Sequence, residues 1–130
     1  MARDIVTVER FAKEKGEGLE LKLDAGERGI RRIIREPTVN RPGLALAGFT
    51  RYFASRRIQV IGNAEASFLK SLDSKDRLRR YLDLLAYKIP CAVFCRGLKP
   101  EPKFKVLAEK FGAPLFTCPL ITMKFINLAT

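Results

Sequence analysis

The feature that most constrains this chain is an alternation, from Arg57 onward, of short apolar segments with segments of helical periodicity. The apolar segments have the length of β-strands and span residues 58–61, 91–95 and 115–118. Strands that alternate with helices along a chain pair in parallel through right-handed crossovers. The sequence therefore predicts an α/β fold with a small, mainly parallel β-sheet flanked by helices.

The helices between these strands are marked by the spacing of their apolar residues. The clearest of them is expected to be capped by Ser74. Its apolar residues fall at i, i+3, i+4 and i+7, and they are Leu78, Tyr81, Leu82 and Leu85. We expect Asn63 and Thr122 to cap two further helices, and a helix after the proline-rich loop to end at Gly112.

The amino-terminal part of the chain has a more mixed pattern. Thr7 is expected to cap a helix that is closed by Gly16 and Gly18. Residues 19–23 alternate leucine with charged residues, which predicts a half-buried strand. Residues 28–35 interleave arginine with isoleucine, and this pattern fits either a short helix or the edge of a sheet.

Length and composition favour one folded domain. The 130 residues are 47% apolar, which suffices for a core of their own. No apolar run reaches the roughly 18 residues of a transmembrane helix, and no secretory leader opens the chain. Three cysteines without a Cys-x-x-Cys pair are typical of a reduced protein. We therefore expect residues 1–130 to form a single cytoplasmic domain without membrane contact.

Missing residue types exclude several kinds of chemistry. The chain has no histidine, which excludes Ser-His-Asp and Cys-His catalysis and histidine-ligated zinc. It has no Gly-Lys dipeptide, which excludes a phosphate-binding P-loop. A dinucleotide fingerprint at Gly16 and Gly18 fails because position 21 is leucine. We therefore expect no catalytic residue, no metal site and no cofactor in this chain.

The three cysteines lie in predicted apolar strands. Cys91 and Cys95 share one face of a strand, and Cys118 lies on a predicted neighbouring strand. Cysteine is among the most buried residue types, so we interpret all three as core residues. A small enzyme with Cys91 or Cys95 as nucleophile is the least favoured alternative.

Basic residues are the strongest surface feature. The 25 Lys and Arg exceed the 14 Asp and Glu by 11, which favours contact with phosphates, nucleic acid or acidic protein surfaces. The basic residues gather in three clusters: Arg28, Arg31, Arg32 and Arg35; Arg51, Arg56 and Arg57; and Lys75, Arg77, Arg79 and Arg80. The second cluster adjoins Tyr52 and Phe53, which makes it a candidate for holding a phosphate or stacking a base. The third is interpreted as a solvated helix face.

Five segments carry a resemblance to a known family. Residues 40–49 and 56–65 resemble the amino-terminal domain of bacterial HPr kinase/phosphorylase. So do residues 67–72, 89–91 and 96–98, which follow in the order and spacing of that family. The resemblance extends from about Val6 to the end of the chain.

The resemblance implies both a fold and a function. The amino-terminal domain of that family looks like the amino-terminal, substrate-binding domain of the Mur ligases. The whole enzyme is a hexamer that phosphorylates a serine of HPr, the phosphocarrier of the phosphotransferase system, with ATP or pyrophosphate and Mg²⁺. It also removes that phosphate by phosphorolysis, in carbon catabolite regulation. The P-loop and catalytic histidine of the family lie in a catalytic domain that is absent from this chain.

What the resemblance implies for this chain is a non-catalytic regulatory or assembly domain. Its partners would be its own catalytic domain, other subunits and, for the whole enzyme, HPr. The loop residues most like the family are Asn40, Arg41, Pro42 and Gly43, together with Arg96 and Gly97. We nominate them as a ligand or interdomain site; the alternative is a pair of turns in which glycine and proline serve backbone geometry.

The basic charge supports a second hypothesis from another class. The chain could be a stand-alone basic binding module for a phosphate-rich ligand or nucleic acid, with nucleic acid the less favoured partner. Binding of oligonucleotides that weakens steeply with salt would distinguish this hypothesis from the first.

Overall fold

A mainly parallel β-sheet forms the middle of the molecule. The computed structural model describes residues 6–36, 38–48 and 53–129, which form a five-stranded sheet of order β1-β5-β4-β3-β2. Its strands are β1 (Lys22–Ala25), β2 (Val39–Asn40), β3 (Ile58–Ile61), β4 (Ala92–Phe94) and β5 (Leu115–Thr117). Strands β2 to β5 pair in parallel, and β1 joins β5 antiparallel. The predicted α/β class is confirmed, whereas the likeness to a Mur-ligase domain stays a prediction.

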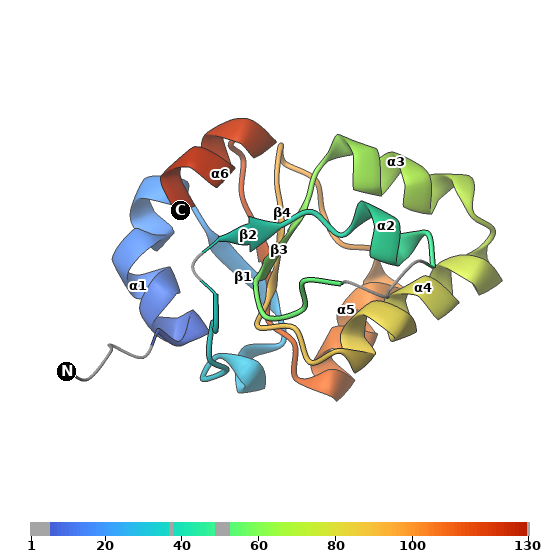
Figure 1. The fold of residues 1–130 in the computed structure, drawn as a ribbon, viewed down its shortest axis with the longest axis horizontal. Coiled ribbons are helices and arrows are strands. Elements are labelled where there is room, and N and C mark those ends of the chain that lie inside the picture. Colours follow the sequence, from blue (N-terminus) through green and yellow to red (C-terminus); the bar gives the residue numbers. More distant parts are fainter. Residues whose placement is uncertain (1–5, 37, 49–52, 130) are drawn as a thin grey trace.

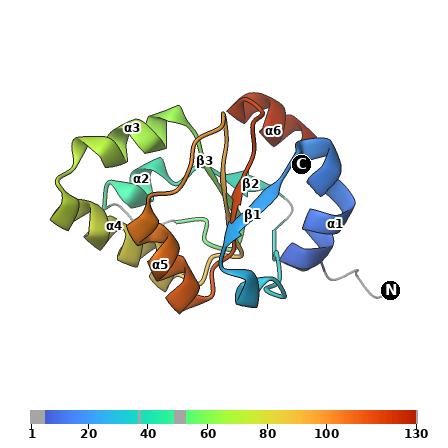
Figure 2. The same cartoon turned by 180° about the vertical axis from the view of Figure 1, so that it is seen from behind.

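Helices cover both faces of this sheet (Figure 1). On one face lie α1 (Val8–Leu19) and α6 (Thr122–Ala129), which are neighbours in both views (Figure 2). The other face carries four helices: α2 (Gly43–Leu46), α3 (Asn63–Ser71), α4 (Ser74–Ala86) and α5 (Pro102–Phe111). A short 3₁₀ helix, η1 (Glu27–Gly29), follows β1. Among the described residues, no helix is long and apolar enough to cross a lipid bilayer.

The apolar run at β4 is explained by its place between two cores. Ala92 and Phe94 belong to the core beneath α2 to α5, whereas Cys91, Val93 and Cys95 belong to the core beneath α1 and α6. All five are at most 5% exposed. Because side chains of a strand alternate between faces, a strand covered on both sides favours apolar residues at successive positions.

The first helix begins as predicted and ends later. The Oγ1 atom of Thr7 accepts a hydrogen bond from the backbone N–H of Arg10 at 3.1 Å, so Thr7 is the N-cap. The strand predicted over residues 19–23 is wrong at its start, because Leu19 is the last residue of α1 and β1 begins at Lys22. Leu19 lies on the same helical face as Phe11, and burial of that face holds the helix together past Gly16 and Gly18.

Three predicted caps are displaced by one residue. Asp73, not Ser74, caps α4, because its Oδ1 accepts from the backbone N–H of Asp76 at 2.8 Å. Gly62 stands at the cap of α3, which Asn63 was expected to occupy, and Thr122 is the first residue inside α6.

The buried face of α4 also differs from the prediction. Helix α4 buries Tyr81, Leu84 and Leu85, which pack toward the sheet and α5. Leu78 is 36% exposed and Leu82 is 38% exposed. The apolar stripe that faces the core is therefore rotated about the helix axis from the predicted one. Leu84 takes the place of Leu78 on the inner face, and both choices fit a period of 3.6 residues.

Candidate functional site

The two loop motifs nominated from the sequence lie at one edge of the sheet. Asn40 is the last residue of β2 and residues 41–43 follow it, whereas Arg96 and Gly97 follow the carboxyl end of β4, with β3 between the two strands. In open α/β sheets, ligands commonly bind outside the carboxyl ends of the strands. The topology thus brings the two motifs to the edge where a site would be expected.

The side chain of Arg41, at this edge of the sheet, is held by contacts within the chain. Its Nε and Nη2 atoms donate to Oε2 and Oε1 of Glu65 at 3.1 and 2.8 Å. Glu65 is 4% exposed, and its Oε1 also accepts from the backbone N–H of Gly62 at 2.9 Å. A Cβ atom on Gly62 would lie 2.6 Å from Nη2 of Arg41 and 2.6 Å from Oγ1 of Thr122. The chain is therefore closely packed around Gly62 at this edge of the sheet. The carboxylate of Glu65 already accepts a hydrogen bond at the amino end of α3.

The side chain of Asn40 is also held by a hydrogen bond to a buried residue. Its Nδ2 atom donates to Oε1 of Gln59 at 2.7 Å, and Gln59 is fully buried. The Nε2 atom of Gln59 donates in turn to the carbonyl oxygens of Ala54 and Arg57, at 2.8 and 2.9 Å. This chain of bonds fixes the end of β2 and the segment before β3, which is a structural task.

Arg96 and Gly97 form a tight turn with positive φ angles of 61° and 73°. Their backbone N–H groups donate to the carbonyl oxygens of Leu120 and Cys118 at 2.8 and 3.1 Å. The guanidinium of Arg96 is exposed and makes no hydrogen bond or ion pair within the described part of the chain. The turn has a clear structural role, and the ligand or interdomain role of both motifs stays a prediction.

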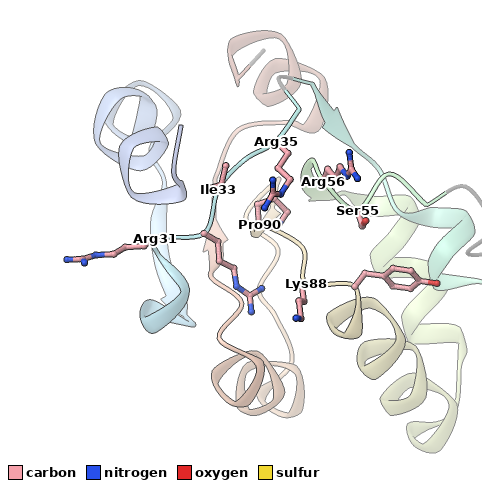
Figure 3. A pocket seen from close by; sticks show the side chains of 9 residues that line it. Arg31, Ile33, Arg35, Ser55, Arg56, Lys88 and Pro90 are labelled. Atoms are coloured by element: carbon pink, nitrogen blue, oxygen red, sulfur yellow. The ribbon is translucent and has the colours of Figure 1, made fainter. Parts of the chain in front are cut away.

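A basic hollow lies at the opposite edge, near the amino ends of β3 and β4. Its volume is about 480 Å³. We call it the cationic hollow, and it is lined by Arg31, Arg32, Ile33, Arg35, Ser55, Arg56, Tyr87, Lys88 and Pro90. Figure 3 shows the side chain of Arg35 next to Pro90, whereas the side chains of Arg31, Arg56 and Lys88 extend away in three different directions. Five of the nine lining residues are cationic and none is acidic.

Backbone bonds fix the segments that carry these cations. The N–H of Arg35 donates to the carbonyl of Arg56 at 3.2 Å, which joins two walls of the hollow. The N–H of Ile34 donates to the carbonyl of Val6 at 2.9 Å, and an isolated β-bridge pairs Thr7 with Ile33. The arginine-rich segment is thus anchored on both sides without regular secondary structure.

Most of the cations in the hollow have no partner of their own. Within residues 6–36, 38–48 and 53–129, the side chains of Arg31, Arg35, Arg56 and Lys88 make no hydrogen bond or ion pair. Arg32 differs, because it donates to the carbonyls of Ile89, at 2.8 Å, and Phe111. Burial, and secondarily the charge of Arg28, lower the pKa of Arg32.

The structure divides the basic patch that the sequence nominated. Arg56 lines the cationic hollow, whereas Arg57 pairs with Glu36, with 2.7 Å between Nε and Oε1. Arg51 lies outside the described residues. The structure joins Arg56 instead to the first arginine cluster, which the sequence pattern left separate. Lys88 was not among the residues nominated from the sequence. The only sequence signal for it is that a basic residue stands just after the end of a predicted helix.

One residue of the third basic cluster, Arg77, joins parts of the fold to one another. The interpretation of this cluster as a solvated helix face is therefore wrong for Arg77. Arg77 donates to the carbonyls of Leu69 and Leu72, both at 2.9 Å, and lies 3.2 Å from Oε2 of Glu101. The hydroxyl of Tyr81 donates to the same oxygen at 2.6 Å. The hydrogen bond from Tyr81 and the nearby Arg77 lower the pKa of Glu101. The pKa of Tyr81 is raised, mainly because its side chain is partly buried.

The cysteines lie in the core beneath α1 and α6, as interpreted from the sequence. Each is at most 1% exposed. Burial raises the pKa of Cys91 and of Cys95 to about 12, and it also raises the pKa of Cys118. A protonated, buried thiol is a poor nucleophile. In the part of the chain that the structure describes, no three His, Cys, Asp or Glu side chains converge on a metal position.

Comparison with known proteins gives consistent results. A family model described as "HPr Serine kinase N terminus" matches residues 6–130. The HPr kinase/phosphorylase of Chloroherpeton thalassium is 37% identical over 127 residues, which cover 96% of this chain and 37% of that protein. The HPr kinase/phosphorylase of Geobacter sulfurreducens is 38% identical over 113 residues, which cover 87% of this chain and 35% of that protein. This chain thus spans little more than a third of either relative.

A solved structure has a similar fold. It contains the CBS and DRTGG domains of the regulatory region of a Clostridium perfringens pyrophosphatase, in complex with the activator diadenosine tetraphosphate. The TM-score is 0.61 at 16% sequence identity, and the match covers 97% of this chain and 51% of the other. At this identity the likeness supports the α/β fold alone.

Proposed function

The chain belongs to the HPr serine kinase N-terminus family, and we propose that it is the non-catalytic regulatory and assembly domain of an HPr kinase/phosphorylase. The whole enzyme would phosphorylate and dephosphorylate HPr of the phosphotransferase system in the cytoplasm, as part of carbon catabolite regulation. The observation that carries this proposal is the family match over residues 6–130, combined with relatives of which this chain spans little more than a third.

The residues of this chain do not fit the nucleotide and metal of such a kinase. The sequence has no Gly-Lys dipeptide to form a P-loop and no histidine. Glu101, a carboxylate beside a hollow of about 480 Å³, is already engaged by Tyr81 and Arg77. We therefore assign ATP or pyrophosphate and Mg²⁺ to the part of the enzyme that the relatives contain and this chain does not.

An apolar surface at α6 supports the assembly role. Ile121, Met123 and Leu128 are 54%, 63% and 47% exposed, although Phe125 of the same helix is fully buried. Lys15 of α1 donates to the carbonyls of Leu128 and Ala129, at 3.1 and 3.4 Å, and so secures the carboxyl end of the helix. Because the family model describes the amino terminus of the kinase, the remainder of a relative follows this helix. We propose that α6 packs against that remainder.

Phosphate transfer to HPr tests the proposal. The chain alone, incubated with HPr, labelled ATP and Mg²⁺, is expected to leave HPr unlabelled. The complete Chloroherpeton thalassium relative serves as the positive control and should label a serine of HPr. Labelling by the purified 130-residue chain would overturn the proposal, because the catalytic groups would then have to lie in this chain.

A further inference from the structure

We propose that the outer surface of α4 and α5 is a docking groove for an acidic amphipathic helix of a partner protein. The two helices lie side by side on the face of the sheet away from α1 and α6 (Figures 1 and 2). Between them is an apolar hollow of about 290 Å³. We call it the α4–α5 groove, and it is lined by Leu78, Pro102, Lys103, Val106 and Leu107.

The two helices that form the groove run parallel. Arg77, near the start of α4, lies 3.2 Å from Glu101, which caps the start of α5. One turn further along both helices, the rings of Tyr81 and Phe104 stack with 4.5 Å between their centroids. These contacts close the inner side of the helix pair, so the outer side chains form two rows along the groove.

Both rows contain apolar side chains that are exposed. On α4, Leu82 stands one turn after Leu78, and both are more than a third exposed. On α5, Val106 stands one turn after Pro102 and is 57% exposed. A helix with apolar residues at i, i+4 and i+7 has the same repeat of one turn, about 5.4 Å. The groove therefore matches an elongated helical ligand.

Positive charge borders the two apolar rows. Each of four cations stands three or four positions from an exposed apolar residue of its own helix and so shares its face: Lys75, Arg79, Lys103 and Lys110. All four are exposed, and within the described ranges 6–36, 38–48 and 53–129 their side chains make no hydrogen bond or ion pair. Exposed apolar residues with a charged rim are typical of an interaction site.

The acidic residues of α4 and α5 do not neutralise these cations. Asp83 pairs with Arg80, and Glu109 accepts a hydrogen bond from the N–H of Gly26. Asp76 is the one acidic residue of the two helices whose side chain has no partner in the described chain. Charge complementarity therefore selects an acidic partner, whereas a second copy of this groove would bring like charges together.

A titration of the complete ¹⁵N-labelled chain with a synthetic peptide tests the groove by NMR. The probe is a helical peptide of about 15 residues, with leucine at i, i+4, i+7 and i+11 and mostly glutamate elsewhere. We expect saturable binding in about 0.15 M salt with a Kd on the order of 10⁻⁵ M. The largest amide shifts should lie in α4 and α5. A peptide of the same composition, with its leucines spread around the helix, should bind at least about tenfold more weakly.

Variants of exposed residues separate docking from general attraction. Val106→Glu should weaken binding of the probe about tenfold, and Lys103→Glu about fivefold, because each places a negative charge in the groove. Lys13→Glu is the matched control, since it reverses an exposed cation of α1 on the other face of the sheet. This control should bind within about twofold of the unmodified chain. Thermal unfolding of each variant verifies that it is folded.

Two results would overturn the proposal. Equal losses in Lys103→Glu and Lys13→Glu, or no saturable binding, would show that net charge alone attracts the peptide. A dimer of the chain alone that Val106→Glu dissociates, measured by sedimentation, would assign the groove to a second copy instead. None of these measurements involves phosphate transfer to HPr or the surface of α6, so the groove and the proposed kinase role fail separately.

Discussion

At the scale of single residues, Arg41 shows how a residue that looks like a ligand contact can serve the fold. Its side chain is 40% exposed, but the side chain of its partner Glu65 is only 4% exposed. Removal of the arginine would leave a buried carboxylate bonded only to the N–H of Gly62. An uncompensated buried charge is among the most destabilising changes in a protein.

Arg41→Ala should therefore lower the free energy of unfolding by about 2 kcal/mol. Arg96→Ala, at the same edge of the sheet but without a partner among the described residues, should change it by less than about 0.5 kcal/mol. Urea unfolding followed by circular dichroism measures both. Equal effects of the two substitutions would show that the ion pair does not stabilise α3.

The buried thiols give a prediction about pH. In the unfolded chain, a cysteine loses its proton near pH 8.5, whereas burial in the folded chain raises the pKa of Cys91 to about 12. The folded state thus keeps a proton that the unfolded state releases. The stability that this contributes is complete below about pH 8.5, and it is lost as the pH rises toward about 12.

The free energy of unfolding should therefore decline above about pH 8.5, and it should decline less steeply in Cys91→Ala. Urea titrations between pH 7 and pH 10 measure this slope. A thiol reagent supplies the control, since the folded chain should react at least about a hundredfold more slowly than the chain in urea. Fast modification of the folded chain would instead favour the cysteine-nucleophile hypothesis.

At the scale of elements, the segment that contains η1 depends on close packing against the carboxyl end of α5. A Cβ atom on Gly29 would lie 1.7 Å from the carbonyl oxygen of Gly112, which is backbone and cannot rotate away. The N–H of Gly26, just before η1, donates to Oε1 of Glu109 in α5 at 2.7 Å, which holds the same two parts of the chain together. Here glycine is needed for close approach.

Gly29→Ala should consequently destabilise the fold by about 3 kcal/mol. Gly97→Ala is the control for backbone effects alone, because its φ is +73° but no atom lies within 4 Å of the added carbon. It should lose only about 1 kcal/mol. Thermal unfolding compares them, and a smaller loss in Gly29→Ala than in Gly97→Ala would contradict the packing described here.

The elements themselves were largely predictable, because local pattern determines them. The strand at Ile58–Ile61 and the helix after Thr7 follow from apolar spacing and a capping side chain. The inner face of α4 was not predictable in detail, because Leu78 and Leu84 both fit a helical period and only the tertiary packing of α4 selects between them. Tertiary contact decides which of two equivalent stripes is buried.

The candidate sites were less predictable than the elements. The sequence identified arginines in two separate clusters, but their convergence depends on the bond between Arg35 and Arg56 and on the course of an irregular segment. Periodicity carries no information about such a segment. Nor does it reveal that Glu36 neutralises Arg57 and leaves Arg56 unpaired.

At the scale of the whole molecule, the two edges of the sheet have different characters. The carboxyl edge is closed by the pair of Arg41 and Glu65, whereas the amino edge opens into a hollow with uncompensated positive charge. Helix α6, which carries the exposed Met123 and Leu128, lies on the same face of the sheet as α1, as Figure 1 shows. The charged hollow and the apolar helix are therefore two distinct surfaces of the molecule.

The most direct test of the assembly role is the association of this chain with the Chloroherpeton thalassium kinase/phosphorylase from which the matched third has been removed. Analytical ultracentrifugation of the mixture should show a complex. Met123→Glu, which places a charge on the apolar surface of α6, should weaken it at least about tenfold. Arg79→Glu on α4 should leave it unchanged. A mixture in which both proteins sediment separately would contradict the account of this chain as an assembly domain.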